Sequence, residues 1–246
     1  MSEQKIPKII HYCWFGRGKK NELIEKCIAS WKKYLPEYEI IEWNEDNFDI
    51  ESNAYVKEAY EAKKWAFVTD YVRLYVMYNY GGIYMDTDVE VLKPLDEFLI
   101  HEAFSGFEAR DSVPTGIMAS AKGQRVIGML LKDYDDMHFI NPDGSYNMTT
   151  NVITITRYFI DNGLKLNNKL QVIDGFAMYP QVYFCPNTFG MMFNKNSSKT
   201  YTIHHFDSSW KDFRRKKDWK YKIRHYLVGV FRNVVGTDGI QKIKGK

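Results

Sequence analysis

Two aspartates separated by one residue, Asp86 and Asp88, are the side chains whose types and spacing point most directly to chemistry. They directly follow residues 83–85, a short apolar stretch that predicts a strand. An unpaired carboxylate is strongly disfavoured at the end of a buried strand, so the pair needs a positive partner there. Carboxylate oxygens are ligands that suit Mg²⁺ and Mn²⁺. The Asp-x-Asp pair therefore predicts a site for a divalent cation.

A second charged pair, Asp70 and Arg73, lies just upstream in a segment that we expect to be helical, residues 66–79. Its apolar side chains recur at close to 3.6-residue spacing. Residues three apart share one helix face, so the pair either forms a weak ion pair there or contributes jointly to a site. Gly81 and Gly82 follow and predict the end of the helix. The segment thus runs from helix through a glycine turn and a strand to the two aspartates.

The N-terminal part of the chain supplies elements that position these groups. We expect a first strand at residues 8–15 that leads into a glycine loop at 16–18. A helix at 21–35 capped by Asn21, a strand at 39–43 and a helix at 53–64 follow. Alternating strands and helices of this kind predict an α/β fold with a mainly parallel sheet in this half. Ligands of such folds dock at the carboxyl ends of the strands.

The part of the chain after Asp88 has a less regular pattern. Helices are expected at residues 124–136 and 152–160. Short strands are expected at 89–92, 103–108, 116–121, 172–173, 178–180, 182–184 and 201–205.

Length and composition agree with one substantial hydrophobic core: the chain has 246 residues, of which 45% are hydrophobic. Cys13, Cys27 and Cys185 lie far apart without a CxxC motif, which argues against a disulfide framework and a structural zinc site. The first residues lack the apolar region of a signal peptide, and no run approaches the ~18 apolar residues of a membrane span. We therefore expect a cytoplasmic protein.

The last segment, residues 211–246, differs from the rest in charge. It holds twelve Lys or Arg against three Asp, interleaved with aromatic residues. We expect a catalytic domain over 1–210 and a basic, aromatic, helical tail over 211–246. Such a tail fits an anionic membrane surface at the inner face of the membrane, or else packs on the domain as a solvated helix. Nucleic acid is not an expected partner, because the remainder of the chain is acidic overall.

Four segments together resemble the DXD-containing sugar-binding glycosyltransferases of family 32. They are I-P-K-I-I-H-Y-C-W-F-G at 6–16, D-Y-V-R at 70–73, Y-G-G-I-Y-M-D-T-D-V at 80–89 and H-H-F-D-S-S-W at 204–210. That family includes bacterial capsule and surface-polysaccharide enzymes and fungal mannosyltransferase relatives, with a more distant likeness to glucosylating clostridial toxins. The resemblance implies a single glycosyltransferase A-type, Rossmann-like domain, a nucleotide-sugar donor, Mn²⁺ or Mg²⁺, and transfer with retention of configuration.

The resemblance also implies ligands for the cation. Asp88 is expected to bind it directly, and Asp86 to bind it through water or to hold the ribose. His205 is expected to complete the shell, although the family can have a carboxylate at this position. His204 is the adjacent alternative, since neighbouring residues on a strand face opposite ways. Without a cation, the two histidines are an ordinary surface or core pair.

The donor sugar and diphosphate have expected contacts of their own in the family. Asp70 is expected to accept hydrogen bonds from sugar hydroxyls, and Arg73 to bridge sugar and phosphate with its fork of donors. Ser208 and Trp210 are expected to reach the diphosphate.

Nucleotide contacts are expected at the end of the first strand, in the helix at 66–79 and in the strand at 83–85. Trp14 is expected to stack on the base or else to lie in the core, and Tyr84 to contact the nucleotide or simply to pack. Thr69 is a weaker candidate for the base pocket. His11 is expected in the core, on the strand face opposite Trp14. Two further positions are placed beside the donor: Thr150 and Asn151.

The expected activity is that of a retaining, metal-dependent glycosyltransferase. It would move a sugar from a nucleotide-diphosphate sugar, with a UDP-sugar favoured, to a glycan or lipid-linked glycan in surface polysaccharide (capsule) synthesis. No carboxylate stands out as a covalent nucleophile, so front-face transfer is expected, in which the leaving phosphate helps to deprotonate the acceptor.

The Asp-x-Asp segment has three other interpretations. A haloacid-dehalogenase-type phosphatase would use Asp86 as nucleophile, but its motif normally lies near the N-terminus. A non-catalytic glycan- or lipid-binding module would not need the intact charged pairs. A calcium loop starting at Asp86 would have Val91 where the sharp turn needs glycine, and is rejected.

Overall fold

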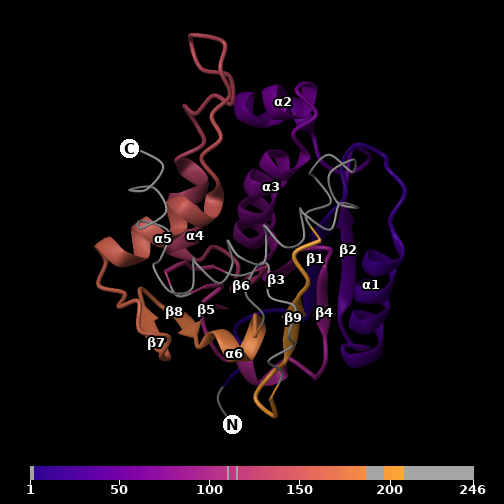
Figure 1. Ribbon diagram of the computed structural model, residues 1–246, viewed down its shortest axis with the longest axis vertical. Helices are drawn as coiled ribbons and strands as arrows, with labels where there is room; N and C mark the ends of the chain where they lie inside the picture. The colour runs from indigo at the N-terminus through magenta and orange to yellow at the C-terminus, as the bar shows by residue number, and fades with distance from the viewer. Residues whose placement is uncertain (1–2, 110, 115, 187–196, 208–246) are drawn as a thin grey trace, which may run out of the picture.

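The computed structural model describes residues 3–109, 111–114, 116–186 and 197–207, and its fold is α/β (Figure 1). The first half contains β1 (Ile9–Cys13), α1 (Glu22–Tyr34), β2 (Glu39–Trp43), α2 (Ala54–Glu61), α3 (Trp65–Tyr80) and β3 (Gly82–Met85). The second half contains β4 (Val89–Val91), β5 (Ala103–Gly106), β6 (Ile117–Ser120), α4 (Arg125–Lys132), α5 (Asn151–Asp161), β7 (Gln171–Ile173), β8 (Phe176–Tyr179), α6 (Gln181–Phe184) and β9 (Thr202–His204). The predicted α/β class is confirmed. Ser208, Trp210 and the basic tail at 211–246 lie outside the described residues.

One seven-stranded sheet, in the order β2-β1-β3-β6-β5-β8-β7, forms the centre of the domain. β1 runs parallel to both β2 and β3, as expected for the first half. β6 enters antiparallel to both β3 and β5, and β5 then pairs parallel with β8. The carboxyl ends of β1 and β3 therefore open on the same edge of the sheet, where ligands of α/β proteins dock.

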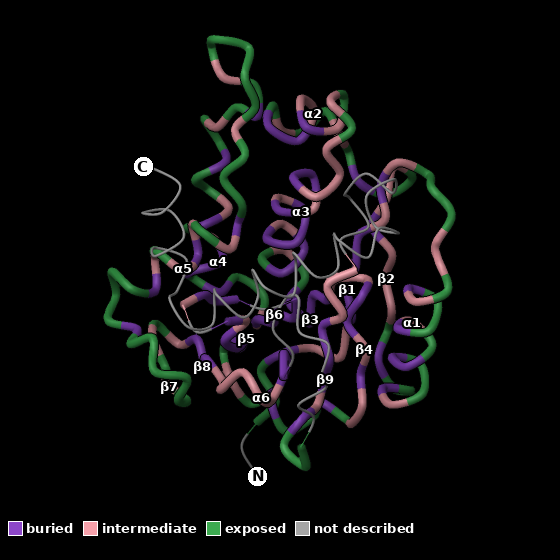
Figure 2. The backbone as a smooth tube through the Cα atoms, viewed as in Figure 1, coloured by how far each residue is buried: buried purple, intermediate pink, exposed green. Residues whose placement is uncertain are grey.

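Side chains alternate between two hydrophobic cores, one on each face of the sheet. Cys13, Tyr84 and Met118 pack with helices α2, α3, α4 and α5 on one face. Ile10 and Ile83 pack with α1, β4 and α6 on the other. The central strands are buried and the outer loops are exposed (Figure 2). A sheet covered on both faces explains why β1 and β3 are almost wholly apolar.

Local signals account for the ends of the helices near the site. The Asn21 side chain accepts a hydrogen bond from Ile24 N at 3.0 Å and begins α1, as predicted. Helix α3 ends at Gly81, which has a φ of +71°. Gly82 follows with a φ of +110°, and a Cβ there would lie 2.7 Å from the Ile9 carbonyl oxygen. Only glycine allows the chain to turn this closely against β1 and enter β3.

Two expected strands differ from the structure. Residues 182–184 are helical in α6, because Pro180 precedes them as N-cap and proline is suited to the start of a helix. The strand expected at 89–92 forms, as β4, but it leaves the central sheet and pairs antiparallel with β9. Among the described residues, none of the helices has the length and apolar character needed to cross a membrane.

His11 is a core residue, as expected, and it ties three elements together. The Trp43 indole N–H donates to His11 Nδ1 at 3.0 Å, so the ring proton is on Nε2, which donates to the Gly81 carbonyl at 2.8 Å. This joins β1 to β2 and to the turn between α3 and β3. Burial lowers the pKa of His11, although its bond to Gly81 acts in the opposite direction.

Replacing His11 with leucine is expected to destabilise the protein by about 1–3 kcal/mol for each polar group that it leaves unpaired, Trp43 Nε1 and Gly81 O. Urea unfolding followed by tryptophan fluorescence measures this. His138→Leu is the control: its side chain is 61% exposed and pairs with Glu58, so the loss should stay below about 1 kcal/mol.

The stability difference between wild type and His11→Leu is also expected to depend on pH. Above the ordinary pKa of 6.5, neutral His11 contributes its full stabilisation. As the pH falls below 6.5, the unfolded chain binds a proton that the folded core excludes, so this stability is lost. Wild type should therefore lose more stability than His11→Leu between pH 7.5 and pH 5.5. Equal losses in the two proteins would contradict the role assigned to His11.

Candidate active site

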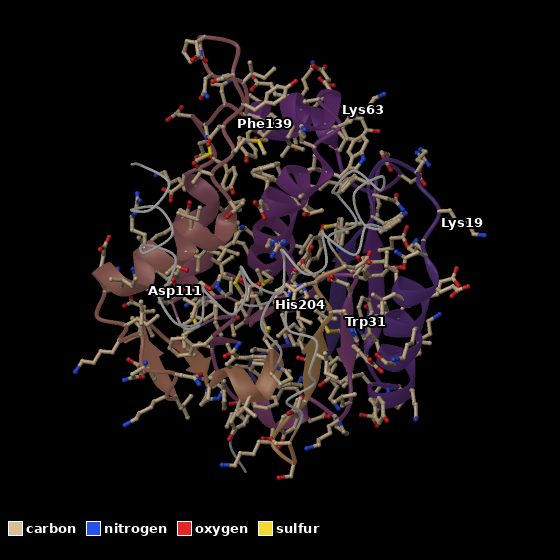
Figure 3. The ribbon with its side chains drawn as sticks, in the orientation of Figure 1. Lys19, Trp31, Lys63, Asp111, Phe139 and His204 are labelled. Atoms are coloured by element: carbon tan, nitrogen blue, oxygen red, sulfur yellow. The ribbon has the colours of Figure 1, made fainter. Side chains whose placement is uncertain are left out.

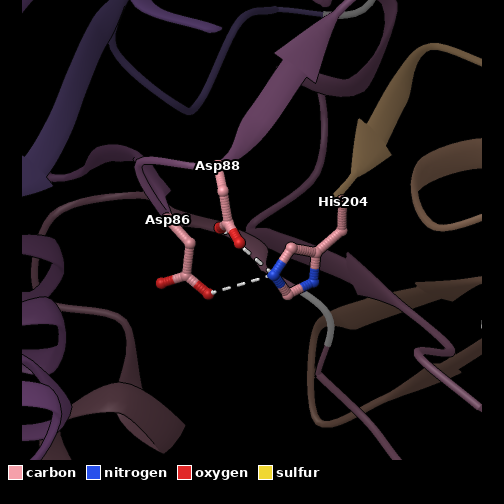
Figure 4. A group of neighbouring side chains, drawn as sticks. All are labelled: Asp86, Asp88 and His204. Atoms are coloured by element: carbon pink, nitrogen blue, oxygen red, sulfur yellow. Dashed lines mark ion pairs between the residues drawn. The ribbon is translucent and has the colours of Figure 1, made fainter. Parts of the chain in front are cut away.

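Three side chains converge where β3 ends and β4 and β9 meet: Asp86, Asp88 and His204 (Figure 4). His204 Nε2 lies 3.3 Å from Asp88 Oδ1 and 3.9 Å from Asp86 Oδ2. One ligand atom from each residue lies within 4.8 Å of the other two. Asp88 and His204 are buried, and Asp86 is the most exposed of the three. The cluster lies near the middle of the molecule, at the position labelled His204 in Figure 3.

The pairing of β4 with β9 decides which histidine faces the aspartates. Val89 lies opposite His204 in this antiparallel pair, so His204 is brought beside Asp88. His205, which the sequence predicts as the third ligand, does not face the two aspartates; His204 does. His205 Nε2 instead lies 2.9 Å from Glu90 Oε2, on the other side of the strand pair, and Lys26 binds the same carboxylate at 3.0 Å. Alternation along the strand explains this exchange.

Asp88 is held by the segment that follows β9. Its Oδ2 accepts a hydrogen bond from Asp207 N at 2.7 Å, and its backbone carbonyl accepts one from His205 N at 3.0 Å. Burial alone would raise the pKa of Asp88, but His204 and the Asp207 N–H outweigh it and hold this pKa below its usual value. Burial would likewise lower the pKa of His204, and Asp88 raises it well above the ordinary value instead. A cation bound here would have to displace the imidazole proton.

Arg73 connects the Asp pair to Asp70. Its Nη2 lies 3.1 Å from Asp86 Oδ1 and 3.7 Å from Asp70 Oδ1, and its guanidinium lies 4.6 Å from the centre of the Tyr84 ring. The i,i+3 ion pair that the sequence left open is therefore present, but both residues are buried and Arg73 also pairs with Asp86. Burial raises the pKa of Asp70 to about 6, although Arg73 acts to lower it.

Asn151, at the start of α5, holds Asp70 from the second half of the chain. Its backbone N–H donates to Asp70 Oδ2 at 3.0 Å, and its side-chain amide donates to the Asp70 carbonyl at 2.8 Å. Its own Oδ1 is buried without a hydrogen-bond partner among the described residues. This places Asn151 beside Asp70, with an acceptor available for a ligand hydroxyl. Thr150 is the N-cap of α5 and makes no side-chain cap bond.

The expected nucleotide-binding residues occupy different settings. Tyr84 is buried beneath Arg73. Thr69 is half-buried, and its hydroxyl donates to the Ala66 carbonyl within α3 at 2.8 Å. Trp14 is half-buried at the end of β1; its indole N–H donates to the Gly18 carbonyl at 2.6 Å, and Lys20 Nζ lies 5.3 Å from the ring centre. Binding of a base by these residues stays a prediction.

Two residues that the sequence analysis does not single out lie beside His204: Glu108 follows β5, and Gly116 precedes β6. Glu108 Oε1 lies 3.7 Å from His204 Nδ1. A Cβ at Gly116 would lie 3.0 Å from the same nitrogen and 2.9 Å from Val89 Cγ2, so only glycine leaves room for the ring. Neither position carries a motif, and only the pairing of distant strands brings them here.

The donor set fits a divalent cation. Two carboxylates and one imidazole meet at one point, and oxygen ligands with a nitrogen suit Mn²⁺, while Mg²⁺ prefers oxygen. Asp70, Asp86 and Asp88 also outnumber the positive groups among them, Arg73 and His204. Such an excess of buried negative charge favours a bound cation.

Comparison with known proteins gives a family match over the part of the chain that carries the Asp pair. Residues 21–105 match the family described as "Glycosyltransferase sugar-binding region containing DXD motif". This part of the chain is similar to the sugar-binding region of those glycosyltransferases. The match includes Asp70, Arg73, Asp86 and Asp88, whereas His204 lies outside it. It favours the glycosyltransferase interpretation over the phosphatase.

Among curated proteins the chain is similar to yeast mannosyltransferases. It is 31% identical over 125 residues to inositol phosphoceramide mannosyltransferase 3 of Schizosaccharomyces pombe, covering 48% of this chain and 34% of that protein. It is 29% identical over 134 residues to mannosyl phosphorylinositol ceramide synthase CSH1 of Saccharomyces cerevisiae, covering 49% and 32%. The chain therefore spans about a third of the length of these relatives.

Two solved glycosyltransferase structures also show partial similarity. PaToxG glycosyltransferase aligns with a TM-score of 0.43 and 19% identity, over 52% of this chain and 60% of that one. A glycosyltransferase involved in glycosylation of the major capsid of PBCV-1 aligns with a TM-score of 0.40 and 13% identity, over 72% and 84%.

Proposed function

We propose that this protein transfers a sugar from a nucleoside-diphosphate sugar to a hydroxyl acceptor, with the Asp86–Asp88–His204 cluster holding a divalent cation. The observation that carries the proposal is this cluster, joined through Arg73 to the buried Asp70. A bound Mn²⁺ or Mg²⁺ would supply Lewis-acid stabilisation of the diphosphate leaving group.

The protein's own side chains have distinct roles in this scheme. Asp70 accepts hydrogen bonds from donor-sugar hydroxyls, and Asn151 fixes its carboxylate. Arg73, held between Asp70 and Asp86, directs its remaining guanidinium donors at the sugar and the diphosphate. Trp14 and Tyr84 contact the nucleotide. Ser208 and Trp210, which lie outside the described residues, contact the diphosphate.

Retention through front-face transfer follows as part of the proposal. The carboxylates beside the cluster are engaged with Arg73, Asn151, His204 or backbone N–H groups. None of these arrangements favours a covalent nucleophile among Asp70, Asp86 and Asp88. Trapping of a glycosyl–enzyme adduct on any of them would contradict front-face transfer.

The donor we favour is a UDP-sugar, and the acceptor is a glycan or a lipid-linked glycan of a surface polysaccharide such as a capsule. The yeast relatives are named as an inositol phosphoceramide mannosyltransferase and a mannosyl phosphorylinositol ceramide synthase, which supports a lipid-linked acceptor and adds mannosyl donors to the test. We further propose a cytoplasmic enzyme that works at the inner face of the membrane through its basic segment, residues 211–246.

A thermal-shift panel of UDP- and GDP-sugars, with and without Mn²⁺, tests the function. Donor at ~100 Kd should stabilise wild type by roughly 2.7 kcal/mol, and only when Mn²⁺ is present. Release of the nucleoside diphosphate then confirms turnover. No stabilisation by any nucleotide sugar, together with hydrolysis of a simple phosphate ester, would overturn the proposal in favour of a phosphatase.

The two histidines provide a matched pair for the same assay. His204→Ala should weaken Mn²⁺ binding by at least about a hundredfold, because losing a ligand should cost no less than losing one of its supporting partners. His205→Ala, one residue away on the opposite face, should leave Mn²⁺ affinity within about threefold of wild type. The reverse result would return the assignment to His205.

A further inference from the structure

The second ring nitrogen of His204 faces a carboxylate that the proposed reaction does not use. Nε2 lies on the side of Asp86 and Asp88, while Nδ1 points away from them (Figure 4). Nδ1 is buried, lacks a hydrogen bond of ordinary length among the described residues, and lies 3.7 Å from Glu108 Oε1. The imidazole is thus placed between the Asp pair and a third acidic side chain.

The backbone around Glu108 is fixed on both sides. Glu108 N donates to the Ser112 carbonyl at 3.0 Å, and Gln181 Nε2 donates to the Glu108 carbonyl at 2.8 Å. The residue follows β5, which is paired on both edges with β6 and β8. A Cβ at Gly116 would lie 3.0 Å from Nδ1, so glycine at this position avoids crowding the ring. A small shift of the carboxylate or of the ring is enough to bring Oε1 to hydrogen-bond distance.

The chemistry of imidazole explains what a carboxylate next to Nδ1 can do. A neutral imidazole carries its proton on one nitrogen and its lone pair on the other. For Nε2 to bind a cation, the proton must be on Nδ1, and a partner at Nδ1 fixes this tautomer and the plane of the ring. Cys185 also interacts with His204, but a thiol is a weak acceptor compared with a carboxylate.

We propose that Glu108 is the positioning residue of the cation site: it accepts the Nδ1 proton of His204 and holds Nε2 toward Asp86 and Asp88. This inference rests on the proposed metal-dependent function. The carboxylate lies on the opposite side of the imidazole from the Asp pair, so Glu108 acts through His204 and is not itself a ligand.

The neighbouring histidine offers a matched control. His205 Nε2 lies 2.9 Å from Glu90 Oε2, the same type of pair, but on the other face of the β4–β9 ribbon. Glu90→Ala removes a carboxylate from a histidine that does not face the Asp pair. Glu108→Ala and Glu108→Met remove it from the one that does, and methionine nearly preserves the shape of the side chain. Glu108→Gln keeps an oxygen acceptor at the same place.

The experiment is Mn²⁺ titration of the full chain, followed by the EPR signal of free Mn²⁺, with thermal unfolding of the metal-free proteins as a folding check. Glu108→Ala and Glu108→Met should bind Mn²⁺ about 10–100-fold more weakly than wild type. Glu108→Gln should stay within about threefold, because its amide oxygen still accepts the Nδ1 proton. Glu90→Ala should bind Mn²⁺ with the same affinity as wild type. Pulsed EPR of bound Mn²⁺ should show imidazole nitrogen coupling in wild type and weaker coupling in Glu108→Met.

The possible failures are distinguishable. If wild type does not bind Mn²⁺, the metal-dependent function itself fails. If wild type binds and both Glu108→Ala and Glu108→Met bind equally well, only the role of Glu108 is overturned. Equal weakening in Glu108→Gln and Glu108→Met, with unchanged nitrogen coupling, would also overturn positioning, since the effect would then come from the lost negative charge.

Discussion

Replacing Asp88 with alanine is expected to remove Mn²⁺-dependent sugar transfer, with kcat/KM falling by about a thousandfold or more. Stabilisation of the diphosphate leaving group by a cation contributes several kcal/mol, and each 1.36 kcal/mol corresponds to a factor of ten. Asp88 is the ligand least open to replacement, because it is buried and lies 3.3 Å from His204 Nε2. Donor turnover across a Mn²⁺ titration measures the loss.

Asp88→Asn separates chemistry from folding in this test. Its amide oxygen can still accept the hydrogen bond that Asp207 N makes with Asp88 at 2.7 Å. Without metal, we expect this variant to unfold at a temperature close to that of wild type. It should nevertheless lose the stabilisation that Mn²⁺ and donor together give wild type. Full activity of Asp88→Asn at ordinary Mn²⁺ concentrations would mean that the cation is not held here.

The second large effect is expected at Arg73, on both stability and activity. Arg73→Ala leaves the Asp70 and Asp86 carboxylates facing each other without the guanidinium that lies 3.1 Å from Asp86. Breaking a buried pair in this way costs about 3–5 kcal/mol. Urea unfolding at pH 7.5 measures the loss of stability. Arg125→Ala, which breaks an exposed pair with Asp174, should cost no more than about 1 kcal/mol.

Arg73→Lys tests the catalytic part of the role. Lysine keeps one positive charge near Asp86 but loses the planar fork that can contact two partners at once. We expect a folded protein that binds Mn²⁺ and has a kcat/KM at least about a hundredfold below wild type, a loss of ~2.7 kcal/mol. If Arg73→Lys transferred sugar as well as wild type, Arg73 would be a structural residue alone.

Much of the N-terminal half could be predicted because its signals are local. Asn21 begins α1, Gly81 ends α3 and residues 39–43 form β2 as expected. Side-chain caps, positive-φ glycines and apolar runs act within a few residues, so they can be recognised directly in the sequence. Residues 182–184 are expected as a strand and instead form part of helix α6, because a run of three apolar residues fits either pattern.

The candidate site was predictable only in part. Asp70, Arg73, Asp86 and Asp88 lie within nineteen consecutive residues, 70–88, and their spacing already pointed to a joint site. Asn151 belongs to a segment without a motif, and only the contact between α5 and α3 brings it to Asp70. Glu108 and Gly116 are not predicted as site residues, because nothing in the sequence around them distinguishes them from other residues at the ends of short strands.

The joint role of the two carboxylates, the helix–turn–strand that carries them and the α/β class can all be predicted from the sequence, because each depends on patterns within short segments. Tertiary structure decided which histidine joins them. His204 and His205 differ by one position, and a strand turns alternate residues to opposite sides, so their roles depend on how β9 pairs with β4. That pairing joins segments more than a hundred residues apart, and the packing of the whole domain sets its register.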